Sequence, residues 1–378
     1  MSRKACLADR NRARGVRRRA RFEAPGDTTY SCEYDIASEC HIPGVLAYSD
    51  DALMCGLLST EPESDGLYHY LLRITYPQTD MHYNKRAHPR GYYFKDGIVG
   101  ELLSLFSLHF QCRFFLAATY FGELSNHGLK LRQEHRFLRG SLDRHVYSKL
   151  FTNGHRNFAT DLPHFLDRIK LLPPEEHQAF ILASYHYAKA LKEAGLDSEM
   201  VFVRLVSAVE ALTSRTTLDK RDDLFMGKDF KQIVNPAALT GEQLEALQNT
   251  FEARKAGLRF VRFVEKYSKG AFKGGAWKAK HLKIKRADLP QVLKRIYRVL
   301  SAYLHTGEPM YLSQFMRVPD RWDTDPSLGM TIDNRSFKAS QQLPYTYWFE
   351  NLVRICLINY LNEKTNLSQI GTSGPDAK

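Results

Sequence analysis

An arginine and a histidine stand seven residues apart in a segment whose apolar spacing predicts a helix over residues 288–305. Seven residues make almost two helical turns, so Arg298 and His305 are expected on one face, about 10 Å apart along the axis. The opposite side is expected to be buried and contains Leu293, Ile296, Leu300 and Leu304. The pair therefore points away from the core of its own domain, with Lys294 and Ser301 at the edge of its face.

Such a pair suits cleavage of a phosphodiester bond in RNA. Imidazole exchanges protons near neutral pH, so His305 can deprotonate a ribose 2′-hydroxyl or protonate the leaving oxygen. Guanidinium is always charged and forks onto phosphate oxygens, so Arg298 can hold the scissile phosphate. This chemistry needs no metal and no other cofactor, and it yields a 2′,3′-cyclic phosphate. The alternative is structural: a solvated arginine, and a histidine that complements the helix dipole just before Gly307.

Glu210 is a second candidate, because it lies within a largely apolar segment that predicts a helix. Its carboxylate could orient a histidine or arginine across a helical bundle in support of the pair. A salt bridge on the domain surface is the competing interpretation.

Positive charge is concentrated in two stretches of the 378-residue chain, whose formal net charge is +12. Residues 1–22 carry nine Lys and Arg against one acid, and residues 254–295 carry fourteen against two. Local basicity favours a polyanion partner, and aromatic residues among the lysines (Tyr267, Phe272 and Trp277) could stack RNA bases. The candidate RNA-binding residues are Lys266, Lys269, Lys273, Trp277, Lys278, Lys280, Lys283, Lys285, Arg286 and Lys294. A solvated helix face followed by a loop is the competing reading.

Composition and motifs exclude several other classes of protein. With 43% hydrophobic and 25% charged residues, the chain is neither disordered nor fibrous. Its six cysteines include no Cys-x-x-Cys pair, and no histidine cluster has metal-ligand spacing, so no metal site is expected. Charged residues interrupt the longest apolar run, residues 97–121, so no membrane partner is expected. We expect a reduced, cytoplasmic, soluble protein.

The coarse pattern predicts an α+β protein: a mixed N-terminal domain followed by an all-α domain. The expected divisions are a disordered basic arm at 1–24, a mixed α/β domain at 25–156, a helical domain at 157–365 and a disordered tail at 366–378. Strands are predicted at 67–76 and 112–120 and a helix at 97–109. Further helices are predicted at 173–194, from 198 to about 212, and at 241–267, 288–305 and 344–364, the second of them capped by Asp197 or Ser198.

Two segments resemble the ApeA-type HEPN (higher eukaryote and prokaryote nucleotide-binding) family. Met200-Val-Phe-Val-Arg-Leu-Val-Ser-Ala-Val-Glu-Ala-Leu212 is similar to one helix of that family, and Ile296-Tyr-Arg-Val-Leu-Ser-Ala-Tyr-Leu-His-Thr-Gly307 is similar to another. The amphipathic segment 251–267 is similar to the helix between them. The resemblance covers about residues 170–365, roughly half of the chain.

This resemblance implies a helical bundle that forms a homodimer, with a metal-independent endoribonuclease site at the dimer interface. It also implies a role as an anti-phage or toxin effector, the N-terminal domain serving as sensor or recognition part. Arg298 and His305 match the family's Arg-x(4–6)-His motif. The subfamily form is Arg-Ser-x-x-x-His-Gly, however, and here Leu300 precedes Ser301 and Thr306 follows His305.

Two alternatives therefore stay open. One is a non-catalytic HEPN module that binds RNA, a nucleotide or a partner protein, with Ser301 as a phosphate contact or a spectator. The other is a structural dimerisation domain, which predicts no affinity for RNA.

Overall fold

The structure is a computed structural model. It describes residues 29–39, 42, 45–49, 54–59, 67–77, 97–121, 131–134, 161–194, 196–213, 255–272, 283–310, 323–324 and 342–370. The expected arm at 1–24, residues 241–254 of one predicted helix and residues 371–378 of the expected tail lie outside this set. The chain divides into two compact units: unit 1 contains residues up to Leu196 and from Leu361 onward, and unit 2 is Asp197–Tyr360.

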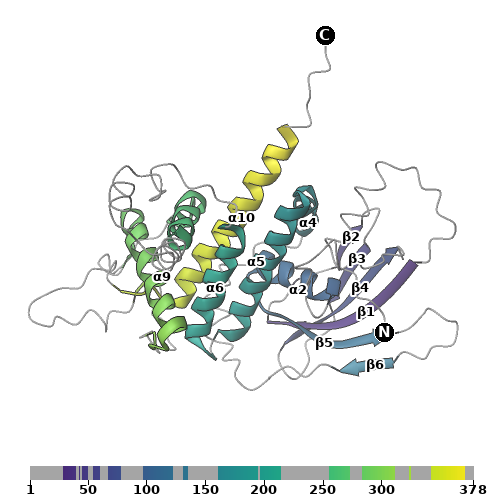
Figure 1. Ribbon diagram of the computed structural model, residues 1–378. Helices are drawn as coiled ribbons and strands as arrows, with labels where there is room; N and C mark the ends of the chain where they lie inside the picture. Colours follow the sequence, from purple (N-terminus) through teal and green to yellow (C-terminus); the bar gives the residue numbers. More distant parts are fainter. Residues whose placement is uncertain are drawn as a thin grey trace, which may run out of the picture. The chain divides into compact units, whose positions relative to one another are not determined.

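Unit 1 contains a six-stranded antiparallel sheet in the order β2-β3-β4-β1-β5-β6 (Figure 1). Its strands are β1 (Thr29–Ser38), β2 (Val45–Ser49), β3 (Met54–Ser59), β4 (Tyr68–Pro77), β5 (Phe114–Phe121) and β6 (Leu131–Glu134). The strands β1 and β4 pair over all ten residues, from Thr29 opposite Pro77 to Ser38 opposite Tyr68. The strands predicted at 67–76 and 112–120 are confirmed as β4 and β5, whereas the sequence analysis did not predict the other four.

Helix α2 (Gly97–Phe110), predicted at 97–109, is buried on every side. All residues from 101 to 110 are buried, which is typical of a helix that is apolar around its whole circumference. It packs against β5 and against helix α5 (Pro174–Glu193). Aromatic side chains pack where α2 meets the sheet: the ring centroids of Phe106 on α2 and Phe114 on β5 are 5.7 Å apart.

Helices α4 (Leu162–Leu171) and α5 belong to unit 1 together with the sheet. The Tyr48 hydroxyl on β2 donates a hydrogen bond to Asp167 on α4 at 3.1 Å, and α5 packs on α2. The division therefore falls after Leu196 and not at the expected 156/157 boundary. The sequence pattern identified α5 as a helix but could not show that its apolar side covers α2. Helix α4 was not predicted.

Within its described residues, unit 2 consists of helices joined by turns and coil, apart from one isolated bridge between Thr324 and Pro344. Its helices are α6 (Ser198–Thr213), residues 255–267, the short η3 (Arg286–Asp288), α9 (Leu289–Thr306) and α10 (Thr346–Ile370) as far as Tyr360. Asp197 caps α6, because its Oδ1 accepts a hydrogen bond from the Met200 amide at 2.9 Å. A sheet-containing unit and a helical unit confirm the α+β class.

The interior of unit 2 is built from the apolar sides of these helices. The apolar residues that recur at helical spacing in α6 are all buried: Phe202, Leu205, Val206, Val209 and Leu212. The Phe202 ring stacks on Phe349 of α10 with the ring centroids 5.2 Å apart. Burial of this kind, more than helix propensity, stabilises helices of such length.

Helix α10 continues to Ile370, so the disordered tail predicted from residue 366 is wrong for residues 366–370. The C-terminal turns are fixed within unit 1 by polar contacts. Lys364 Nζ lies 3.0 Å from Glu176 Oε1 of α5, and Arg168 of α4 donates a hydrogen bond to Asn362. The polar composition of this segment suggested a tail, but these partners are distant in sequence and hold it as a helix.

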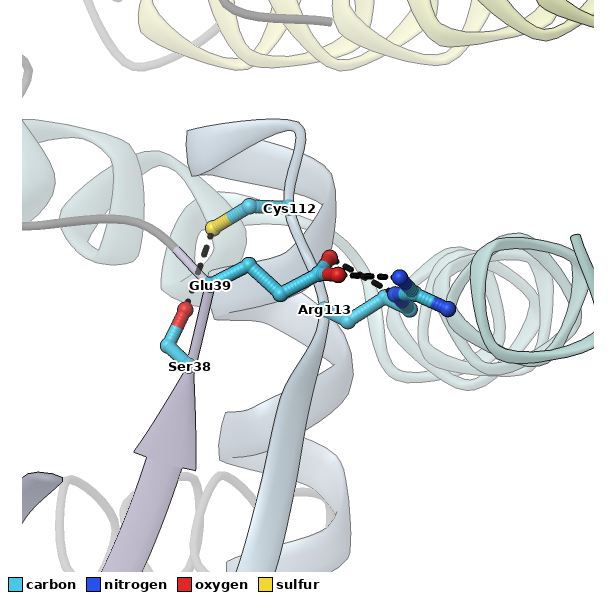
Figure 2. Close-up of polar contacts among 4 residues, drawn as sticks. All are labelled: Ser38, Glu39, Cys112 and Arg113. Atoms are coloured by element: carbon cyan, nitrogen blue, oxygen red, sulfur yellow. Dashed lines mark hydrogen bonds and ion pairs between the residues drawn. The ribbon is translucent and has the colours of Figure 1, made fainter. Parts of the chain in front are cut away.

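A buried ion pair joins the end of β1 to the start of β5 (Figure 2). Arg113 donates to both carboxylate oxygens of Glu39, with Nε 2.6 Å from Oε2, and its side chain is 3% exposed. Beside it, Ser38 Oγ lies 3.5 Å from the thiol of Cys112. The pair neutralises two charges that the packing of β1 and β5 removes from water.

Replacing Arg113 by Met should therefore lower the unfolding free energy by about 3–5 kcal/mol, because Glu39 keeps a buried charge without its partner. Arg73→Met is the matched control, since Arg73 is 60% exposed in its pair with Glu33 and should cost about 1 kcal/mol or less. Urea denaturation followed by circular dichroism gives both values. Equal losses for the two variants would contradict the buried-pair assignment.

Candidate active site on helix α9

Helix α9 carries the candidate catalytic pair, and its amphipathic sequence decides which way the pair faces. Its buried residues are Leu289, Val292, Leu293, Ile296 and Leu300. The prediction that Leu304 completes this stripe is wrong, because Leu304 is 58% exposed. All residues from 304 to 309 are exposed, so the last turn of α9 extends beyond the packed part of the helix.

Arg298 and His305 are both exposed, on the side of α9 opposite its buried residues, as predicted. Lys294 is exposed on the same side, and Ser301 is half-buried at its edge. Within the described residues, neither Arg298 nor His305 makes a hydrogen bond or an ion pair. Both side chains are therefore available to a ligand or to a second protein surface.

Glu210 is connected to α9, but not through the pair. Its Oε1 accepts a hydrogen bond of 2.9 Å from the hydroxyl of Tyr297, the residue directly before Arg298. Burial, and then the Glu210 carboxylate, raise the pKa of Tyr297 well above its ordinary value, so the phenol stays protonated and donates. Glu210 thus supports the site by anchoring α9, and the sequence analysis missed Tyr297 as its partner.

A close approach between helices places Tyr297. A Cβ atom on Gly257 would lie 3.1 Å from the Tyr297 ring, and the Phe260 ring centroid is 5.6 Å from that of Tyr297. Glycine at 257 lets the ring lie directly on the backbone of the helical residues 255–267. The hydrogen bond and the ring contact together fix the rotation of α9 about its own axis.

The C-terminal end of α9 is fixed by Glu199, a residue that the sequence analysis did not single out. Its Oε1 accepts the backbone N–H of Met310 at 2.6 Å. Partial burial, and then the Glu199 carboxylate, raise the pKa of Tyr303. Between these contacts, Gly307 ends the helix with a positive φ of 71°, and its amide donates to the Tyr303 carbonyl at 3.1 Å. The backbone on both sides of His305 is therefore held.

The expected RNA-binding residues divide into three groups. Those that are exposed are Lys266, Lys269, Lys285, Arg286 and Lys294, and Lys283 is half-buried. Those that lie outside the described residues are Lys273, Trp277, Lys278 and Lys280.

The aromatic residues of that stretch differ in exposure. Phe272 is half-buried, and its ring contacts Trp348. Tyr267, in contrast, is buried and packs on Tyr360 with ring centroids 5.4 Å apart, so its ring is not an exposed platform for base stacking and the expectation is wrong there. The alternation of aromatic and basic residues in the sequence could not show this, because it does not reveal whether a ring points into the core or into solvent.

A buried carboxyl group holds the segment that leads into α9. Asp323 is 2% exposed, and its Oδ2 accepts the Ile284 backbone N–H at 2.8 Å. Its Oδ1 has no hydrogen-bond partner in the structure. Burial raises the pKa of Asp323 to about 6, although the Ile284 hydrogen bond and the charge of Lys283 act in the opposite direction.

Metal ligands were not expected, and the described ranges hold no group of three or more His, Cys, Asp or Glu side chains that could bind a metal ion. His177 is a buried core residue and His186 is half-buried. In the same ranges, every helix is too short or too polar to cross a membrane. No family model, curated protein or solved structure matches this chain.

Tyr297→Phe tests the anchoring of α9. Losing a hydrogen bond to a carboxylate should lower the unfolding free energy of unit 2 by about 1.5–3 kcal/mol. Glu210→Gln keeps an acceptor oxygen for the phenol, so it should lose clearly less. Denaturant titration of the full chain measures both, and a Tyr297→Phe protein as stable as the wild type would contradict the anchor.

Asp323→Asn tests the buried carboxyl group through pH. The folded pKa of about 6 exceeds the ordinary 3.8, so the folded state binds this proton more tightly than the unfolded chain does. The contribution of Asp323 is therefore most favourable below about pH 4 and is lost as the pH rises to 6.

Asparagine keeps an acceptor for the Ile284 amide without a charge. The variant should match the wild type near pH 4 and exceed it by up to about 3 kcal/mol above pH 6. Thermal unfolding of both proteins between pH 4 and 8 measures the difference. A gap that does not change with pH would contradict the assignment.

Proposed function

We propose that this chain is a metal-independent endoribonuclease of the HEPN type, with its site on helix α9. The observation that carries the proposal is the joint exposure of Arg298 and His305 on one side of a helix whose other side is buried. The anchors at Tyr297 and Glu199 support it, because they hold the backbone that carries both side chains. A helical unit 2 is compatible with a HEPN bundle.

In this proposal, His305 acts as the acid–base group and Arg298 binds the scissile phosphate. The imidazole takes the proton from the ribose 2′-hydroxyl, the 2′-oxygen attacks phosphorus, and the bond to the 5′-oxygen breaks. The 5′-oxygen leaves with a proton, and the products end in a 2′,3′-cyclic phosphate and a 5′-hydroxyl. Arg298 offsets the negative charge that builds up on the phosphate oxygens in the transition state.

RNA and a second copy of the chain are the partners that this mechanism requires. Exposed lysines and Arg286 would bind flanking phosphates, and Ser301 would contact the phosphate held by Arg298. A homodimer brings two copies of His305, so one imidazole can act as base while the other acts as acid. We infer a cytoplasmic anti-phage or toxin effector, with unit 1 as its recognition or sensor part.

A non-catalytic HEPN module that binds RNA, a nucleotide or a partner protein is the second candidate. Leu300, at the position of the subfamily arginine, is only 6% exposed and belongs to the core. The guanidinium of Arg298 therefore lies on a different side of α9 from the position that the subfamily arginine occupies. In addition, His305 has no described partner that would orient its ring.

Cleavage of labelled single-stranded RNA in EDTA decides between these candidates. The wild type should produce 2′,3′-cyclic ends, and His305→Ala and Arg298→Ala should each lower the rate by about a factor of 100 or more. RNA with a 2′-deoxynucleotide at the cleaved position should stay intact there. Mass spectrometry of the fragments identifies the ends.

Matched controls are available for both residue types. His164 is an exposed histidine on α4, and Arg262 is an exposed arginine paired with Glu265, so His164→Ala and Arg262→Gln should leave the rate unchanged. Cleavage that survives His305→Ala would show that the site assignment is wrong. Binding without cleavage would favour the second candidate.

A further inference from the structure

An arginine that the sequence analysis did not select, Arg295, lies one helical turn before Arg298 on α9. Its Nε is buried from solvent and has no hydrogen-bond partner. Its guanidinium makes no ion pair with any described residue. A buried guanidinium is normally paired, as that of Arg113 is with Glu39.

The charge of Arg295 is also not balanced by its own helix. The eighteen residues of α9 contain Lys294, Arg295, Arg298 and His305 but no aspartate or glutamate. Burial, and then the charge of Arg298, lower the pKa of Arg295 below its ordinary value, so the two guanidiniums lie within electrostatic reach of each other. Two like charges one turn apart, one of them partly desolvated, destabilise the free protein. An anion bound between them would reverse this effect.

We propose that Arg295 binds an RNA phosphate next to the one held by Arg298, so that the strand runs along α9. This inference rests on the proposed function for its choice of ligand. His305, Arg298 and Arg295 then follow one another over about 15 Å of helix axis, which is longer than a single nucleotide. The site therefore takes an oligonucleotide with at least two phosphates, and each guanidinium can fork onto phosphate oxygens.

The test measures binding separately from cleavage. A fluorescent 2′-O-methyl RNA of twelve nucleotides has no free 2′-hydroxyl, so it cannot be cut by the proposed mechanism. Arg295→Met removes the charge but keeps an unbranched side chain. Its Kd from fluorescence anisotropy should be about tenfold weaker than that of the wild type, the loss expected for one charge-assisted contact. The slope of log Kd against log salt concentration should fall by about one.

Arg262→Gln is the control of equal charge change, and its Kd and salt slope should equal those of the wild type. Arg295→Lys keeps the charge and should bind more tightly than Arg295→Met. The melting temperature of Arg295→Met should be equal to or higher than that of the wild type, because a desolvated and unpaired charge is removed.

Several results would overturn the proposal. An unchanged Kd for Arg295→Met, or a wild type that does not bind the RNA, would do so directly. A melting temperature several degrees lower would make Arg295 a structural residue. If the wild type binds RNA through Arg295 but does not cleave it, the phosphate site stands and the proposed nuclease activity fails.

Discussion

The anchoring of helix α9 through the hydroxyl of Tyr297 is the interaction on which the geometry of the candidate site depends. The burial of leucine and isoleucine on one side of a helix fixes its direction only loosely, because apolar contacts tolerate small rotations. The hydrogen bond from Tyr297 to Glu210 and the contact of the Tyr297 ring with Gly257 do not tolerate such rotations. Since Arg298 follows Tyr297 directly in the chain, this contact also decides where the guanidinium is directed.

The residues of α9 that stabilise the fold and the residues that carry its charge lie on different sides of the helix. Leu293 and Ile296 contribute to packing and are almost completely buried, whereas Lys294 and Arg298 contribute none of that packing and are exposed. Arg295 lies between these two classes, because it is half-buried and has no counter-ion among the described residues. Natural sequences tolerate such locally unfavourable positions where function needs them, and packing elsewhere offsets the cost.

The sequence predicted the elements that depend on residues close together in the chain, and it did not predict the features that depend on contacts between distant residues. Helices α2, α5, α6 and α9 and the strand β4 were predicted because their own residues carry the periodicity. The domain boundary was misplaced because it depends on α5 packing against α2, a contact between residues about 80 positions apart. Leu304 fits the apolar stripe by spacing alone, but nothing in spacing shows where the neighbouring helices end.

The site itself was predictable in part for the same reason. The shared exposure of Arg298 and His305 follows from their seven-residue separation and the opposite apolar stripe. Tyr297 and Glu210 are 87 residues apart, so their hydrogen bond could not be predicted from local pattern. Arg295 gave no signal either, because an unpaired guanidinium can be recognised only after its surroundings are known.

The shape of a single exposed helix sets a further requirement for the proposed chemistry. Every residue from 304 to 309 is exposed, so the described residues of one chain leave His305 open to water. Charge stabilisation in a transition state is strongest where water is excluded and the groups are held in advance. In addition, one imidazole cannot take a proton from the nucleophile and donate another to the leaving group in the same step. A second α9 facing the first would meet both needs, because the proposed site would then contain groups from both copies and neither copy would complete it by itself.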